Sequence, residues 1–206
     1  MLGLLIGDCL HNLRAALDNL VYELLVARHG DPPPDKFAVS SEFPIFSDRP
    51  MILRQHQRKI GGIDPAAQTI IEGLQPYQRG NDFGSHPLWL LHNLSNIDKH
   101  RVPHVALLTI PSAFAYFVNS ETDTPVGTSN IEWFVGLIEN SAVIARYEPD
   151  PDYPDAEMKV NFTPIFGIAF GNEGSAAYGR QVILTLDWMG SHIRNHVIPP
   201  LRPYLT

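Results

Sequence analysis

Apolar side chains in the first half of the chain recur at spacings of three and four residues, which is the pattern of amphipathic helices. Gly30 and the prolines after it end the first and longest of these segments, and Pro103 ends the last. Asp64 followed by Pro65 is typical of a helix N-terminus. The pattern predicts a bundle of about four helices, at residues 4–28, 49–59, 65–74 and 85–100.

The pattern changes at residue 105, after which Val, Ile, Phe, Tyr and Trp dominate three segments. We expect an antiparallel β-meander built from residues 105–118, 131–147 and 158–170. Residues 178–197 return to a helical pattern that ends at Pro199 and Pro200. The sequence therefore predicts an α+β protein, with a helical region at 1–104 and a region of sheet plus C-terminal helix at 105–206, packed as one unit.

Composition narrows the classes of function. The chain has 206 residues, and its 22 acidic against 15 basic side chains give a net charge of -7. This charge provides no general attraction to nucleic-acid phosphates, so any contact of that kind must be local. The single cysteine, Cys9, excludes an internal disulfide framework and a multi-cysteine zinc site.

No apolar run approaches the roughly 20 residues of a membrane-spanning helix, and residues 1–6 are too short and uncharged for a signal peptide. We therefore expect a cytoplasmic protein without a membrane partner. The chain opens directly into its first predicted helix, which leaves room for a further N-terminal segment.

A first polar stripe lies opposite the apolar face of the first predicted helix and contains His11, Arg14 and Asp18. Arg14 and Asp18 are four residues apart, so they can pair along the helix. A solvated helix face is usually rich in Lys and Glu, whereas this one mixes His, Asn, Tyr, Asp and one Arg, which favours specific hydrogen bonds. The alternative is an exposed face with one weak ion pair.

A second polar stripe lies on the helix predicted at 85–100 and contains Asn96, Asp98, Lys99, His100 and Arg101. A regular helix turns Asp98 and Arg101 toward the apolar side, where a charge is tolerated only with a partner. Arg14 is a natural partner for Asp98, and Asp18 for Arg101 or Lys99. If the helix instead ends before Asp98, both charges reach water.

Three blocks of sequence resemble a family of uncharacterised bacterial and phage proteins. Residues 7–20 are similar to its pattern GDxLHNLRxALDHL, residues 43–46 to FPIF, and residues 94–101 to LNNIDKHR, over about half of the chain. Asn19 and Ser95 stand where the family commonly has His and Asn. The resemblance implies no activity. We expect residues 43–46 to form an extended apolar anchor.

The helical first half is also similar in outline to HEPN domains, which are helical bundles that often act as metal-independent ribonucleases. Their motif is an Arg, a polar residue and a His a few positions on. Two candidate pairs are present, but Pro50 and Gly80 follow the arginines where the polar residue is expected. The motif is therefore absent from both pairs, Arg49 with His56 and Arg79 with His86.

His192 and His196 lie one helical turn apart, a spacing that binds a metal only with a further ligand from elsewhere. No Glu follows His192 as in a zinc protease. Around the other histidines, Lys99 and Arg101 would repel a cation. We expect neither a metal nor a cofactor.

Two functions remain open. In the first, the protein is a binding or assembly module, the two polar stripes form a buried network between helices, and a homodimer is a natural partner state. In the second, the same residues line a pocket for RNA or a nucleotide and act as a HEPN-like, metal-independent ribonuclease. The first is favoured for the charged residues and the second for the histidines. The candidate residues in both cases are His11, Arg14, Asp18, Asn96, Asp98, Lys99, His100 and Arg101.

Overall fold

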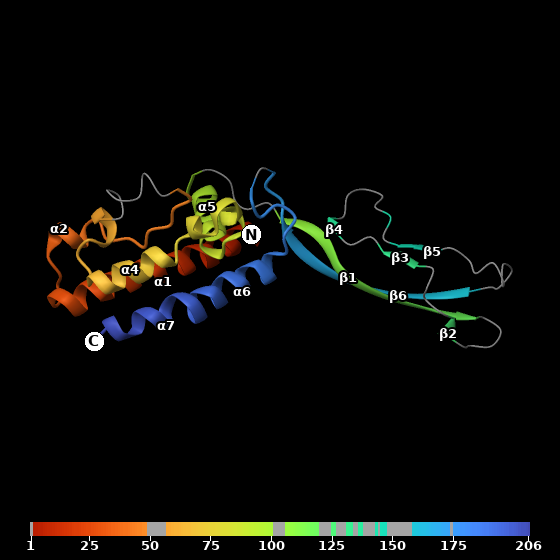
Figure 1. Cartoon of the computed structure of the whole chain (residues 1–206). Helices are drawn as coiled ribbons and strands as arrows, with labels where there is room; N and C mark the ends of the chain where they lie inside the picture. The colour runs from red at the N-terminus through yellow and green to blue at the C-terminus, as the bar shows by residue number, and fades with distance from the viewer. Residues whose placement is uncertain are drawn as a thin grey trace. The chain divides into compact units, whose positions relative to one another are not determined.

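The computed structural model describes residues 2–48, 57–100, 106–119, 125–126, 131–133, 136–137, 143, 145–147, 158–173 and 175–206. The chain divides into two compact units (Figure 1). The helical unit comprises residues 1–105, 172–178 and 183–206, and the strand unit comprises residues 106–171 and 179–182.

The helical unit is built around one long helix, α1 (Leu2–His29). The other elements, in chain order, are α2 (Asp35–Ala38), α4 (Pro65–Gly73), the 3-10 helix η1 (Pro76–Ser85), α5 (Pro87–His100), α6 (Val182–His192), the π-helical turn η2 (Ile193–Val197), α7 (Ile198–Leu201) and the 3-10 turn η3 (Arg202–Tyr204). Within this unit, α6 approaches α1 where Gly190 lies next to Leu13, and α7 contacts α4 (Figure 1).

Local sequence signals set the helix ends as predicted. After α1, Gly30 adopts a positive φ of 88° and its N–H donates to the Val26 carbonyl at 2.7 Å, which closes the helix in the way that glycine permits. At the start of α4, the Asp64 carboxylate accepts from the Ala66 N–H at 2.7 Å. The predicted ends of these two helices are therefore confirmed within one or two residues.

One apolar core fills the helical unit. The stripe of α1 packs against residues from the 43–46 segment, α4, α5 and the C-terminal helices. The fully buried members include Leu10, Leu17, Val21, Leu24, Phe43, Ile60, Ile63, Ile71, Leu90, Leu91, Leu94, Val197 and Leu201. Phe43 and Ile45 are among the buried side chains, which confirms the expected anchor at residues 43–46.

The C-terminal helix differs from its prediction in two ways. It belongs to the helical unit from residue 183 onward, whereas the predicted region grouped it with the sheet. It also continues past Pro199 and Pro200, because these prolines occupy the first turn of α7, where a missing N–H costs no helical hydrogen bond.

The strand unit contains a long antiparallel pair, β1 (Ala106–Asn119) with β6 (Met158–Phe170). Their register runs from Ala106 opposite Phe170 to Asn119 opposite Met158, with an irregularity between Thr109 and Ser112. Two short strands, β2 (Pro125–Val126) and β4 (Gly136–Leu137), pair with β1, and β3 (Ile131–Trp133) pairs with β5 (Ala145–Tyr147).

The predicted α+β class with an antiparallel β-meander is therefore wrong. The described residues are mostly helical, and the strands do not follow one another across a sheet. In a meander the segment at 131–147 would form one continuous strand between the other two. Instead β1 pairs directly with β6, and only the short β4 of that segment also pairs with β1. Strand propensity identified β1 and β6 but carried no information about which strands pair.

No helix of the described residues is long and apolar enough to cross a membrane.

Gly62 sits where α1 and α2 approach the start of α4, and it leaves no room for a side chain. A Cβ at this position would lie 2.6 Å from atoms of both Leu25 and Phe37. The Gly62 carbonyl also accepts from His29 Nε2 at 2.8 Å, so the backbone is held in place.

We expect Gly62→Ala to lower the free energy of unfolding by about 1 to 3 kcal/mol, because the added methyl group must displace core side chains. The measurement is urea denaturation of both proteins. Gly73→Ala is the matched control, since a Cβ there meets no atom within 4 Å. Equal losses in the two variants would contradict the steric explanation.

Candidate binding site of the helical unit

Arg14 lies at the centre of a polar network on α1, with only 6% of its side chain exposed. Its Nη2 donates to the Phe43 carbonyl at 2.7 Å and to Glu42 Oε1 at 2.6 Å, and it lies 3.0 Å from Asp18 Oδ1. A guanidinium removed from water needs acceptors of this kind to offset its lost hydration. The network therefore binds the 42–43 segment to α1.

Asp18 completes the attachment of this segment. Its carboxylate accepts from the Phe43 N–H at 2.9 Å, so α1 holds both backbone groups of Phe43, the carbonyl through Arg14 and the N–H through Asp18. The other carboxylate oxygen of Glu42 pairs with Lys59 Nζ at 2.8 Å. The Phe43 ring is fully buried as a result.

Gln75 holds the same segment from the opposite side. Its Nε2 donates to the carbonyls of Pro44 at 2.8 Å and Ile71 at 3.1 Å, and its Oε1 accepts from the Phe46 N–H at 3.1 Å. The side chain is buried, so all three bonds are shielded from water. Gln75 also immediately precedes η1, and it therefore ties the 44–46 segment to the start of that helix.

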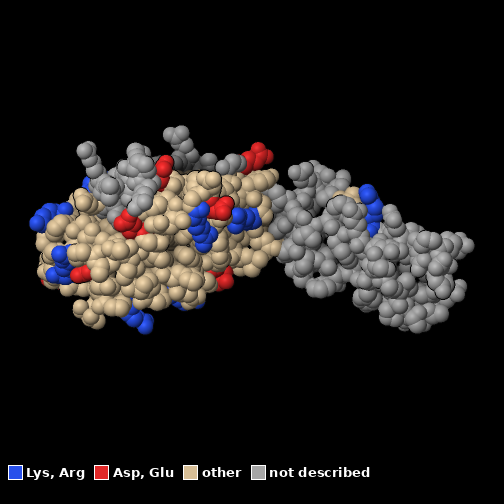
Figure 2. All heavy atoms as spheres, in the orientation of Figure 1, with Lys and Arg blue, Asp and Glu red and all other residues tan. Residues whose placement is uncertain are grey.

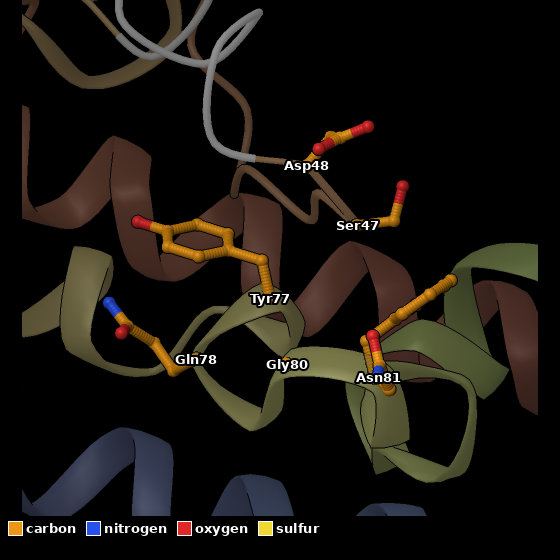
Figure 3. A pocket seen from close by; sticks show the side chains of 7 residues that line it. Ser47, Asp48, Tyr77, Gln78, Gly80 and Asn81 are labelled. Atoms are coloured by element: carbon orange, nitrogen blue, oxygen red, sulfur yellow. The ribbon is translucent and has the colours of Figure 1, made fainter.

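A cavity of about 520 Å³ opens beside this junction (Figure 3). One wall is the end of the segment that Arg14, Asp18 and Gln75 hold, and the other wall is η1. The lining residues are Ser47, Asp48, Tyr77, Gln78, Gly80, Asn81 and Phe83. A volume of this size is within the range of small-molecule sites.

Gly80 shapes the η1 wall. Its φ of 59° and ψ of -126° lie in a region that other residues rarely adopt, and they bend the chain between Gln78 and Asn81. In Figure 3 these two side chains come from either side of Gly80. The bend is the reason that residues on both sides of it can reach one cavity.

The chemistry of the lining is polar and carries little charge. It provides two amides, two hydroxyl groups and two aromatic rings, and Asp48 is its one charged side chain among the described residues. Amides and hydroxyl groups both donate and accept hydrogen bonds, while the aromatic rings offer apolar faces. This lining suits a small polar molecule, and none of the described lining residues supplies a cation for a phosphate.

A histidine cluster lies elsewhere in the helical unit, where the start of α5 meets α6. The rings of His86 and His192 are 5.0 Å apart between centroids and nearly perpendicular, and those of His192 and His196 are 5.2 Å apart. The Nε2 atom of His192 is buried and has no hydrogen-bond partner among the described residues.

His86 serves as a cap for α5, since its Nδ1 accepts from the Leu88 N–H at 3.1 Å. Burial, followed by the charges of Arg79 and His192, lowers the pKa of His86 from 6.5 to about 4. Burial, followed by His196 and Arg79, lowers the pKa of His192 to about 4 as well. Both imidazoles are therefore neutral at pH 7.

The structure describes the side chains of four of the predicted site residues. Arg14 and Asp18 pair as expected, but their described partners on other elements lie at residues 42–43. His11 is exposed on α1, and Asn96 is half-buried with its Nδ2 3.0 Å from His92 Nε2 on α5. The exposed position of His11 does not suit a member of a buried network.

The remaining predicted residues fall outside the description. The backbone of α5 continues through Asp98, Lys99 and His100, but their side chains, together with the whole of Arg101, lie outside the described residues. The pairing of Asp98 with Arg14 and of Arg101 with Asp18 stays a prediction, as do the homodimer and the RNA or nucleotide partner.

Sequence reasoning missed Gln75, the cavity and the part that His86 plays. Gln75 bonds only to backbone groups, which leave no residue pattern, and Ser47 and Tyr77 are ordinary loop residues until the fold joins them. The spacing of His192 and His196 was a visible signal, but His86 is more than a hundred positions away.

A metal site has no support within the part of the chain that the structure describes, where no three His, Cys, Asp or Glu side chains are arranged to hold an ion.

We expect Arg14→Ala to lower the free energy of unfolding by about 2 to 4 kcal/mol, because it removes the donor that Phe43 and two carboxylates share. Chemical denaturation measures the change. The control is Arg58→Ala, since Arg58 is exposed; its loss should stay below about 0.5 kcal/mol. A similarly small loss for Arg14→Ala would show that the network does not support the fold.

The histidine pKa values predict that stability falls as the pH drops from about 6.5 toward 4. In this window the unfolded chain binds protons that the folded protein excludes, so acid favours unfolding; above pH 6.5 the effect is fully relieved. Denaturation midpoints between pH 4.5 and 7.5 measure the slope. His86→Asn, which keeps a capping side chain, should reduce the slope, and the exposed His11→Asn should not.

No family model matches this chain, and neither a curated protein nor a solved structure is detectably similar to it. The function is therefore argued from the site itself.

Proposed function

We propose that the protein is a binding module whose helical unit holds a small polar ligand in the cavity between the 47–48 segment and η1. The observation that carries this proposal is the role of Arg14 and Asp18. Both bind the backbone of Phe43, four residues before the cavity wall begins at Ser47. The charged residues for which a structural network was favoured therefore support a wall of the cavity.

The cavity has the features of a preorganised site. Gln75 directly precedes the η1 wall and hydrogen bonds to Pro44 and Phe46 of the segment that leads into the other wall, while its bond to Ile71 holds it to α4. Support of this kind lowers the entropy that a ligand must offset when it orders its site. A module that binds by hydrogen bonds gains affinity from such rigidity.

The chemistry of the lining selects ligands without negative charge. Asp48 would repel an anion, and no described Lys, Arg or His lines the cavity. Hydroxyl or amine groups on a ligand would find acceptors in Asp48, Gln78 and Asn81, and its apolar parts would contact Phe83. The ligand class is thus a small neutral or cationic molecule with several hydrogen-bonding groups.

The surface charge is consistent with this class. On the visible face of the described helical residues, basic and acidic side chains are interspersed and no broad basic surface forms (Figure 2). With a net charge of -7, the whole chain attracts cations more readily than nucleic acid.

Ligand-observed NMR on the full chain tests the proposal, with glucose, adenosine and spermidine as neutral and cationic probes and citrate as the anionic one. We expect at least one of the first three to bind saturably and citrate not to bind. Asn81→Trp, which fills the cavity, should weaken that binding at least tenfold. Asn19→Trp on the exposed face of α1 is the matched control and should leave it unchanged.

Two outcomes would overturn the proposal. Binding that Asn81→Trp leaves intact would place the ligand elsewhere, and absence of binding by all three probes at millimolar concentration would remove the evidence for a small-ligand module. Cleavage of single-stranded RNA in the presence of a chelator, lost in His100→Ala, would favour the metal-independent ribonuclease instead.

A further inference from the structure

The histidine cluster gathers three imidazoles under the influence of one arginine in an acidic protein. His86 lies at the start of α5, His192 in α6 and His196 in η2. The ring centroids of His86 and His192 are 5.0 Å apart, and those of His192 and His196 are 5.2 Å apart. Arg79 in η1 is the fourth member, because its charge acts on both His86 and His192.

Nothing within the described residues neutralises this cluster. The groups that act on the two buried rings are Arg79, His196 and the rings themselves, and each of them lowers the histidine pKa. No salt bridge among the described residues joins Arg79 or any of these histidines to a carboxylate. The exposed Arg79 brings a positive charge that acts on His86 and His192, and such an electrostatic environment favours an anion.

The hydrogen bonds of the rings also favour an anion as the ligand. Because His86 Nδ1 accepts from the Leu88 N–H, the neutral ring carries its proton on Nε2 and can donate only from that atom. His192 Nε2 is buried without a partner among the described residues. An unsatisfied buried nitrogen costs free energy, and a bound ion is one of the arrangements that satisfy it.

A metal ion fits this cluster less well than an anion does. To coordinate through Nε2, the neutral His86 would have to carry its proton on Nδ1, where it would oppose the N–H of Leu88. Arg79 would also repel the metal. This reasoning agrees with the absence, from the described part of the chain, of three side chains arranged as metal ligands.

We propose that Arg79, His86, His192 and His196 form a binding site for a tetrahedral oxyanion of the sulfate or phosphate class. Arg79 supplies the permanent charge, and the imidazole N–H groups supply directed donors from three different elements. Neutral imidazoles take up protons more readily once the anion is present, so anion binding and protonation strengthen each other. The site is separate from the cavity and goes beyond the binding function proposed for it.

Sulfate is the probe for this site, because it keeps a charge of two from pH 5 to 8. The experiment follows the NMR signals of the imidazoles in the full-length, ¹⁵N-histidine-labelled protein as sulfate is added. A reference titration uses sodium chloride at the same ionic strength in place of sulfate. We expect saturable shifts of the His86 and His192 signals, with an affinity that increases at least threefold between pH 7.5 and 5.5.

Arg79→Gln is the decisive variant, because Arg79 is exposed and its replacement leaves the core intact. It should weaken sulfate binding at least tenfold, whereas Arg202→Gln, another exposed arginine, should not change it. Parallel titrations with inorganic phosphate and adenosine 5′-monophosphate distinguish two sources of the oxyanion. Tighter binding of inorganic phosphate indicates a free oxyanion as the ligand, and tighter binding of the monophosphate indicates a phosphate ester.

Linear, unsaturated shifts, or equal binding by the Arg79→Gln and Arg202→Gln proteins, would mean an adventitious ion only and would overturn the proposal. An affinity that does not change with pH would also contradict it, because the imidazoles would then not take part.

Discussion

The buried guanidinium of Arg14 is the interaction on which the helical unit depends most directly. A charge removed from water needs acceptors, and the Nη2 atom of Arg14 finds them in Asp18 on its own helix and in Glu42 and Phe43 on a distant segment. The Nη1 atom is buried without a hydrogen-bond partner among the described residues. The segment at 42–46 makes no regular secondary structure with its neighbours, so these bonds and those of Gln75 replace a helical or sheet ladder.

The position of the candidate cavity follows from that constraint. A loop wall is normally mobile, because each of its residues costs entropy to order. Here the loop is attached at its start by charged groups of α1 and near its end by Gln75, and the cavity begins directly after the last attachment. The hydrogen bonds that stabilise the unit thus also hold the wall of the cavity in which we propose that a ligand binds.

The two candidate sites differ in charge because different side chains line them. The cavity combines Asp48 with amides and hydroxyl groups, while the histidine cluster combines Arg79 with imidazoles. Neighbouring residues of η1 serve both, with Gln78 and Gly80 facing the cavity and Arg79 acting on the histidines. A single short helix therefore separates the cavity proposed for neutral or cationic molecules from the cluster proposed for anions.

Local order could be read from the sequence because its causes are local. The glycine after α1, the cap at Asp64 and the apolar spacing of the long helix fixed their elements without any knowledge of the fold. The same reasoning correctly marked β1 and β6 as strands and Arg14 with Asp18 as a pair.

Only the tertiary structure decided which elements meet. The pairing of β1 with β6, in place of a meander, joins segments about 50 residues apart, and alternation along a strand does not encode its partner. Likewise, Arg14 binds the backbone of Phe43 and Gln75 binds three backbone groups, and backbone groups are the same in every residue. His86 meets His192 for the same reason: packing of the helices, and not spacing along the chain, brings their rings together.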